Sequence, residues 1–284
     1  MDAVRGVVAV STRHPGTIVL LSERSGRIVG RVGFPGEARH LALATPDGPL
    51  LIPSEPVNRL FTLALDSRGL TSIPVGRHPH AAESVDGRIF VGNELGDSVS
   101  VISAGKVAGR AAGFAQPGGL AGVGGDVAVV DVRAYTLTLI DGRTLRPLGT
   151  QPAGAGPTHA VGDRAGHIFV VDTRGNAVES FAAFPRLRLR ARVALNGTPY
   201  GVALDSRRGR LWVTLTATNQ LAELAVDGGA PRLLAVYSTG RQPNTVAVDP
   251  VTGTVFVADA GDGAVEIIRP RLVGAVAHRR PTGP

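Results

Sequence analysis

The sequence contains no cysteine, which excludes disulfide bonds and thiolate catalysis. Aromatic residues make up only 4% of its 284 residues, so a packed core must be built from Val, Leu, Ile and Ala. It has no run of about 18 apolar residues, the minimum for a membrane-spanning helix. The first residues also lack the apolar stretch of a secretory signal peptide. The compartment stays open: extracytoplasmic if a signal was removed, cytoplasmic otherwise.

Lysine is almost absent as well. Lys106 is the only lysine among 30 basic residues, and the formal net charge is +7. A basic balance of this size can indicate nucleic-acid binding. The richness in Ala, Gly, Arg and Val is equally typical of a GC-rich codon bias, and no aromatic residues alternate with the arginines of residues 186–192 for base stacking. Alternating charge on an outer strand is typical of edge protection. We therefore expect no nucleic-acid partner.

Several sequence motifs of catalysis are missing. There is no glycine-rich phosphate loop between a strand and a helix, and there is no GxSxG nucleophile turn. No long amphipathic helical pattern is evident. These absences argue against nucleotide-binding α/β folds and α/β hydrolases.

The sequence does contain a repeat. A hairpin pattern of two β-rich runs joined by a turn occurs seven times, at an average spacing of about 41 residues, which is the length of a four-stranded propeller blade. The first run of each copy ends at Ser11, Ser54, Asn93, Asp131, Asp172, Leu215 or Asp259. The repeat predicts an all-β fold, a seven-bladed β-propeller with four antiparallel strands per blade, in a single domain over residues 1–284. A six-bladed propeller, the alternative, would have to discard one hairpin.

One copy shows the expected unit. Pro79 precedes an innermost strand at about residues 80–85, Asp86 and Gly87 form a hairpin turn, and strands follow at 89–91, 99–102 and 106–110. The first copy lacks an innermost strand, so one blade is expected to have three strands or to be closed by residues 278–284. The run at 271–277 is predicted to be the outer strand of the last blade.

The repeats carry a family resemblance. Residues 242–268, QPNTVAVDPVTGTVFVADAGDGAVEII, and 198–215, TPYGVALDSRRGRLWVTL, resemble YVTN-type and NHL-type propellers, a neighbourhood that includes virginiamycin B lyases. The resemblance extends over nearly the whole chain. It implies a propeller fold shared by binding scaffolds, lyases and lactonases. For virginiamycin-type lyases it implies metal-assisted opening of a cyclic ester by elimination, although the chain does not match a full His/Glu catalytic set residue by residue.

Residues repeated in most blades are interpreted as structural. Proline before each innermost strand fixes φ. The run-ending side chains are predicted to accept hydrogen bonds from nearby turns. A calcium interpretation of these carboxylates is less favoured, because they occur one per blade around the ring. These repeated residues are Pro79, Pro117, Pro157, Pro199 and Pro243, and Asn93, Asp131, Asp172 and Asp259.

The position after each proline varies instead, so it is free to be functional. It holds His80, Gly118, Thr158, Tyr200 and Asn244; His40 occupies the matching place in an earlier blade, and His159 lies one residue further along. We expect these side chains to meet at the mouth of the central channel. Three imidazoles there suit a divalent ion with an open coordination position. The alternative is a polar, water-filled channel that binds nothing.

Glu83 is the one carboxylate at a position where other innermost strands have Ala or Val. A buried carboxylate is costly unless it is paired. Two interpretations remain open: Glu83 orients His80 or acts as a general base, or it forms an ion pair with an arginine.

Three functions follow from these residues. The first is a non-catalytic, monomeric binding propeller that holds a small ligand, a peptide or a protein partner on its top face. The second is a metal-dependent lyase or hydrolase with one Zn, Mn or Ca ion on His40, His80 and His159, Glu83 or Tyr200 as acid–base, and Asn244 as an orienting residue. The third is a calcium-dependent sugar lactonase that uses Glu83, Asn93 and Asn244. The sequence leaves open whether the protein is an enzyme.

Overall fold

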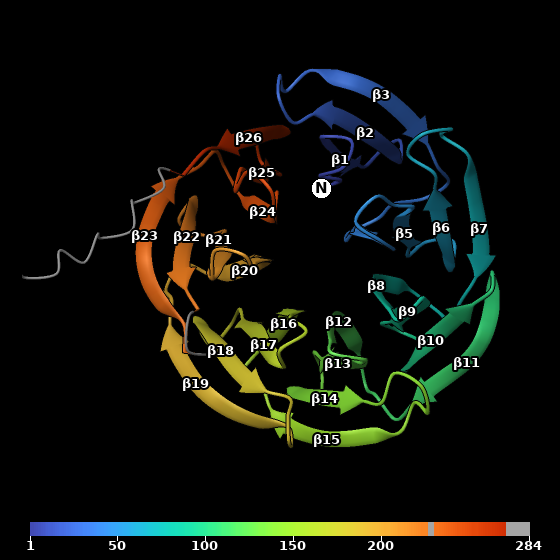
Figure 1. Ribbon diagram of the computed structural model, residues 1–284, viewed down its shortest axis with the longest axis vertical. Coiled ribbons are helices and arrows are strands. Elements are labelled where there is room, and N and C mark those ends of the chain that lie inside the picture. Colours follow the sequence, from blue (N-terminus) through green and yellow to red (C-terminus); the bar gives the residue numbers. More distant parts are fainter. Residues whose placement is uncertain (227–229, 271–284) are drawn as a thin grey trace, which may run out of the picture.

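The computed structural model describes residues 1–226 and 230–270. Over these residues the chain folds into seven antiparallel sheets arranged as a ring around a central axis (Figure 1). In each sheet, strands that are consecutive in sequence are neighbours in space. The seven-bladed β-propeller predicted from the repeat is confirmed. The described residues contain no helix long and apolar enough to cross a membrane.

The blades are numbered here in chain order, from blade 1 at the N-terminal end to blade 7. Blades 2 to 6 have four strands, while blades 1 and 7 have three each in the described residues. The bounds are β1 (Val7–Thr12), β2 (Thr17–Ser22) and β3 (Ile28–Gly33) in blade 1; β4 (Ala42–Leu43), β5 (Leu50–Ser54), β6 (Arg59–Leu63) and β7 (Leu70–Pro74) in blade 2; β8 (Pro79–Val85), β9 (Arg88–Asn93), β10 (Ser98–Ser103) and β11 (Lys106–Ala112) in blade 3; β12 (Pro117–Val123), β13 (Asp126–Asp131), β14 (Thr136–Ile140) and β15 (Pro147–Pro152) in blade 4; β16 (Pro157–Gly162), β17 (His167–Asp172), β18 (Ala177–Ala182) and β19 (Arg188–Ala194) in blade 5; β20 (Pro199–Asp205), β21 (Arg210–Leu215), β22 (Gln220–Ala225) and β23 (Arg232–Ser238) in blade 6; and β24 (Pro243–Val248), β25 (Val255–Asp259) and β26 (Ala264–Ile268) in blade 7.

The predictions for the strands near the two ends of the chain are confirmed in part. Blade 1 has three strands, as expected from its missing innermost strand. The predicted outer strand at 271–277 and the tail 278–284 lie outside the described residues. Blades 7 and 1 are joined by the Thr252 hydroxyl, which donates to Glu23 Oε1 at 3.0 Å.

A bulge at the start of the innermost strands sets the direction of the variable side chains. In blade 3, Pro79 pairs with Asn93 and Ala81 pairs with Gly92, so His80 is the extra residue between them. Strands β12, β16 and β24 have the same irregularity one residue after their prolines, and in β20 it spans two residues. A bulge re-aims the inserted residue. It therefore takes the variable position out of the regular alternation of the strand, at the channel end of each blade.

The apolar core lies between blades. In the described residues, six buried clusters each join one blade to the next, from blades 1 and 2 round to blades 6 and 7. Leucine, valine, isoleucine and alanine supply most of their side chains, in agreement with the low aromatic content. Burial between sheets rather than inside one sheet is what holds a propeller as a ring.

Glycines let the innermost strands of adjacent blades approach closely. A Cβ on Gly119 of β12 would lie 2.6 Å from the carbonyl oxygen of Thr158 and 3.0 Å from the Cα of His159. Blades 4 and 5 therefore touch backbone to backbone beside the channel. This contact fixes the position of His159.

The capping interpretation is confirmed for two of the repeated carboxylates. Asp131 accepts hydrogen bonds from the backbone amides of residues 115, 116 and 134. Asp172 accepts from residues 155, 156 and 175, and also pairs with Arg192 of the outer strand β19 at 2.8 Å. Asn93 differs: its amide donates to Ser98 and Ser100. These side chains hold the blade ends together.

Candidate metal centre

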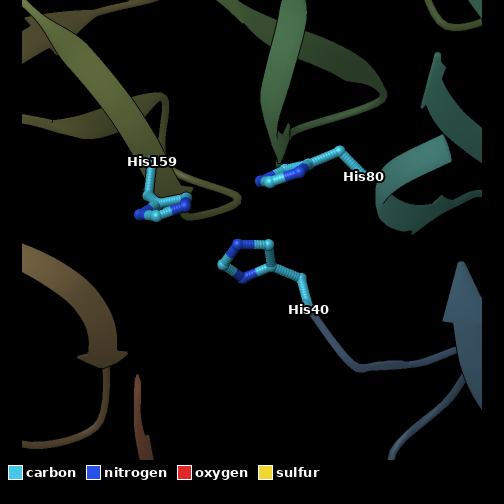
Figure 2. A group of neighbouring side chains, drawn as sticks. All are labelled: His40, His80 and His159. Carbon is cyan, nitrogen blue, oxygen red and sulfur yellow. The ribbon is translucent and has the colours of Figure 1, made fainter. Parts of the chain in front are cut away.

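Three histidines from different blades meet at the channel mouth, as Figure 2 shows. His40 lies in the loop before β4, His80 at the bulge of β8, and His159 in β16. The ring of His40 is centred 4.8 Å from that of His80 and 4.3 Å from that of His159. One nitrogen from each imidazole falls within 4.8 Å of the other two. The expected convergence of these residues is present in the structure.

This meeting spans blades that are not neighbours. His40 belongs to blade 2 and His159 to blade 5, with blade 3 supplying His80 between them. Blade 4 has Gly118 at the corresponding bulge, so its variable position carries no side chain.

Two carboxylates fix the orientation of His80. Its Nδ1 is 2.7 Å from Glu55 Oε1 and 3.2 Å from Glu94 Oε2, and its side chain is buried. A carboxylate only accepts hydrogen bonds, so Nδ1 carries a proton and Nε2 is the nitrogen left for a metal ion. Burial alone would lower the pKa of His80, but the hydrogen bonds to Glu55 and Glu94 outweigh it and raise that pKa.

The other two imidazoles are also prepared to donate lone pairs. His159 Nδ1 lies 3.0 Å from the backbone oxygen of Tyr200, so its Nε2 is free. Burial, followed by the nearby charge of His80, lowers the pKa of His159 to about 4. Burial and then the charges of His159 and His80 hold the pKa of His40 well below its usual range. His40 Nε2 is buried and has no hydrogen-bond partner among the described residues.

This arrangement matches what a transition-metal site requires. Zn²⁺ is held by neutral imidazoles, and three of them leave a fourth position open. Ligating histidines usually donate their other N–H to a carboxylate or a backbone carbonyl, which are the groups found at His80 and His159. Glu55, His80 and Glu94 also bring ligand atoms within 4.8 Å of one another, but there Nδ1 is already used in the hydrogen bond to Glu55. The three-histidine set is therefore the better ligand set.

Glu55 and Glu94 were missed by the sequence reasoning, although a signal exists. Each directly follows a run-ending residue, Ser54 or Asn93. The same position holds Thr12, Val132, Thr173, Thr216 and Ala260 in the other blades. Glutamate at this position occurs only in blade 2 and in blade 3, the blade that contains His80. The rule that variable positions are free to be functional would have found both if it had been applied there.

Further polar groups surround the two glutamates. Arg39 Nε donates to Glu55 Oε2 at 3.1 Å, and Gln116 Nε2 donates to Glu94 Oε1 at 2.8 Å. His78 lies 3.7 Å from Glu55 and 3.5 Å from Glu94. The hydrogen bond from His80 is the main reason that the pKa of Glu94 falls to about 2. Burial opposes ionisation of Glu55, but His80 and Arg39 outweigh it and lower that pKa. Both glutamates are charged near neutral pH.

Tyr200 joins the site, whereas Glu83 does not. The Tyr200 ring meets the ring of His159 edge-on, with centroids 4.5 Å apart and an interplanar angle of 87°. Glu83 packs against Gly122, where a Cβ would lie 3.1 Å from its Oε1. The carboxylates at His80 are Glu55 and Glu94, so the expectation that Glu83 orients His80 is corrected. Its expected ion pair with an arginine is also absent among the described residues. Burial of this unpaired carboxyl raises its pKa to about 7.

Asn244 and the predicted lactonase set are not brought to the triad. Asn244 lies at the bulge of β24, and no side-chain hydrogen bond links it to the histidines in the described residues. Asn93 uses its amide within its own blade, on Ser98 and Ser100. Glu83, Asn93 and Asn244 therefore do not form a compact group in the part of the chain that the structure describes.

The comparisons with known proteins show the fold. No protein-family model matches the chain, and no curated protein matches its sequence. Among solved structures, Kuenenia stuttgartiensis hydrazine synthase is similar with a TM-score of 0.81 at 15% identity, covering 95% of this chain and 94% of that one. A streptogramin B lyase is similar with a TM-score of 0.78 at 16% identity, covering 92% and 89%. A putative 6-phosphogluconolactonase from Bacteroides uniformis ATCC 8492 has a TM-score of 0.79 at 14% identity, covering 94% and 93%. The chain is thus a β-propeller whose structural neighbours have diverse functions.

Proposed function

We propose that this protein is a ligand-binding propeller whose site at the channel mouth contains one divalent transition-metal ion held by His40, His80 and His159. Zn²⁺ is the first candidate. The observation that carries the proposal is the convergence of three imidazoles from separate blades, one of which has a buried and unpartnered Nε2. A fourth coordination position left open by three ligands is where a small molecule or a side chain of a peptide would bind.

The surroundings of the triad support metal binding over a merely polar channel. A water-filled channel does not require that each imidazole be oriented from its Nδ1 side. Here a carboxylate contacts Nδ1 of His80 and a backbone carbonyl contacts Nδ1 of His159, so in both rings Nε2 is the nitrogen left for a metal ion. His40 and His159 have lowered pKa values and are neutral at pH 7, as ligands must be. The pKa of His80 is raised, so a bound ion would have to displace a proton from its Nε2. A bound ion would satisfy the buried nitrogen of His40.

A second candidate function is a metal-dependent lyase or hydrolase. It is favoured by the phenol of Tyr200 beside His159, which supplies an acid–base group next to the open position. The similarity to streptogramin B lyase and to virginiamycin B lyase from Staphylococcus aureus agrees with it, as does the sequence resemblance to YVTN- and NHL-type propellers. Binding at the triad is common to both functions. Turnover of a cyclic ester by the metal-loaded protein would select the second.

The proposal is tested by elemental analysis of the purified, dialysed protein before and after incubation with Zn²⁺. We expect about one ion per chain, since three histidines form one site. His40→Ala and His80→Ala should each lose the ion. His167→Ala is the matched control, because His167 pairs with Asp163 at 2.8 Å in the β16–β17 hairpin, away from the triad.

The outcomes separate the interpretations. If His40→Ala, His80→Ala and His167→Ala all keep the metal content of the natural sequence, the ion is bound elsewhere. If the natural sequence takes up no Zn²⁺, Mn²⁺ or Ca²⁺, the channel mouth is only a polar lining.

A further inference from the structure

Beside the triad, the guanidinium of Arg39 is held in place on one side only. Its Nε donates to Glu55 Oε2 at 3.1 Å, and Glu55 in turn holds His80. The side chain of Arg39 is 45% exposed. Its two terminal nitrogens have no carboxylate or carbonyl acceptor among the described residues, and the hydroxyl of Tyr200 lies close to the guanidinium. The fixed Nε leaves two parallel N–H groups directed away from Glu55, in the geometry that a carboxylate accepts.

Tyr200 supplies a second donor near the same guanidinium. Its ring packs edge-on against His159, so its position is tied to the triad. Burial raises the pKa of Tyr200, and Arg39 close to the hydroxyl opposes that rise. The phenol therefore stays protonated at neutral pH and can donate a hydrogen bond. Arg39 and Tyr200 come from blades 2 and 6, and their polar groups lie close to each other beside the triad.

The charges here favour an anion once a metal ion is present. Glu55 and Glu94 carry negative charge, but both are engaged: Glu55 by His80 and Arg39, Glu94 by His80 and Gln116. Three neutral imidazoles add no negative charge to a divalent ion, so the +2 of the ion and the +1 of Arg39 exceed the −2 of Glu55 and Glu94 and the site stays positive by one unit. The open coordination position and the free side of Arg39 would both attract the same negatively charged oxygen ligand.

We propose that the ligand of this site carries a carboxylate, which binds the metal through one oxygen and is clamped by the terminal N–H groups of Arg39 and the hydroxyl of Tyr200. This inference rests on the proposed function, because it needs a metal ion on the triad. It names the ligand class, a small carboxylate or the C-terminus of a peptide. An amide or an alcohol of the same shape has no negative charge for the arginine to recognise.

The test uses Co²⁺ in place of Zn²⁺, because the visible absorption of Co²⁺ responds to its fourth ligand. Cobalt-loaded protein is titrated with acetate, and with acetamide as the neutral isostere. We expect acetate to change the spectrum at concentrations at which acetamide does not. Arg39→Gln should weaken acetate binding about tenfold or more while Co²⁺ affinity changes less, and Arg39→Lys should restore part of the loss. Arg207→Gln, on an exposed turn, is the matched control.

The failures are distinguishable. Absence of cobalt uptake would overturn the proposed function and this inference with it. Normal cobalt uptake combined with no response to acetate would overturn this inference alone. Equal responses to acetate and acetamide, or equal acetate affinity in Arg39→Gln and Arg207→Gln, would show that Arg39 does not recognise a carboxylate. A stronger response to inorganic phosphate than to acetate would replace the carboxylate by a phosphate ligand and so contradict the class named here.

Discussion

The Nδ1 of His80 lies 2.7 Å from the Oε1 of Glu55, which precedes it by 25 residues and belongs to the neighbouring blade. This contact decides which nitrogen of His80 faces the other two histidines. It also means that the candidate metal centre depends on a residue that would never touch the ion.

The first prediction concerns this contact. Glu55→Gln keeps the shape but removes the charge that orients His80, so metal affinity should fall about 10- to 100-fold, the usual cost of losing such a partner. Competition with a chromogenic chelator measures the affinity. Glu37→Gln is the control, because Glu37 pairs instead with the exposed ring of His14. Equal affinities of the two variants would contradict a positioning role for Glu55.

Glu83 gives the second prediction, on pH dependence. Burial raises its pKa from 4.5 to about 7, so the folded protein holds this proton more tightly than the unfolded chain does. Stability is then lost as the pH rises between these two values, because the unfolded chain ionises at a lower pH than the folded protein does. Glu83→Gln should abolish this loss and, at pH 8, exceed the natural sequence in stability by up to about 3 kcal/mol. Urea unfolding of both proteins at pH 5 and pH 8 measures this effect. If Glu83→Gln differs from the natural sequence in free energy of unfolding by the same amount at both pH values, the prediction is contradicted.

The third prediction tests the close contact of blades 4 and 5. Gly119→Ala would place a methyl group 2.6 Å from the Thr158 oxygen and 3.0 Å from the Cα of His159. Overpacking of this kind costs about 1–3 kcal/mol. The displacement of His159 should also weaken metal binding. Gly33→Ala, where no atom lies within 4 Å of the new Cβ, should do neither. Thermal unfolding and metal titration of both variants provide the measurement, and a neutral Gly119→Ala would show that the strands can separate without cost.

Replacement of two run-ending aspartates by asparagine is predicted to change the stability of the fold in opposite directions. Asp172 accepts three backbone amides and an arginine, so Asp172→Asn should destabilise the fold by about 2 kcal/mol. Among the residues that the structure describes, neither carboxylate oxygen of Asp259 has a partner. Burial, then Glu266 and Asp262, raises its pKa to about 6. Asp259→Asn should therefore stabilise the protein above pH 6 and have little effect at pH 4. Loss of stability in both variants would contradict the distinction.

The repeat length was sufficient to predict the fold, because each blade carries its own turn residues and β-rich runs. The position after each inner-strand proline also identified His80, Tyr200 and, by analogy, His40. The width of the channel mouth cannot be predicted from any single repeat. It follows from the packing of seven sheets, and it decides that His40 and His159 meet although two blades separate them. The contact between Glu55 and His80 could not be predicted from the sequence for a similar reason, because it crosses the boundary between two blades. Glu83 was assigned to His80 because it lies nearby in sequence, but alternation along β8 turns it toward Gly122 instead.

The spacing of the triad along the chain has a mechanical consequence. His40, His80 and His159 are separated by 40 and 79 residues, and a bound ion would tie blades 2, 3 and 5 together with blade 4 enclosed between them. A ring of sheets can open at any of its seams. With the ion in place, opening between blades 2 and 5 would require a coordination bond to break, whereas the other four seams are not crossed by any of these bonds. Of those four, only the seam between blades 7 and 1 lacks a buried apolar cluster in the described residues. Transient opening of the ring would then be directed to that seam, and metal binding would show as slowed amide hydrogen exchange in blades 2 to 5 with little change at the seam.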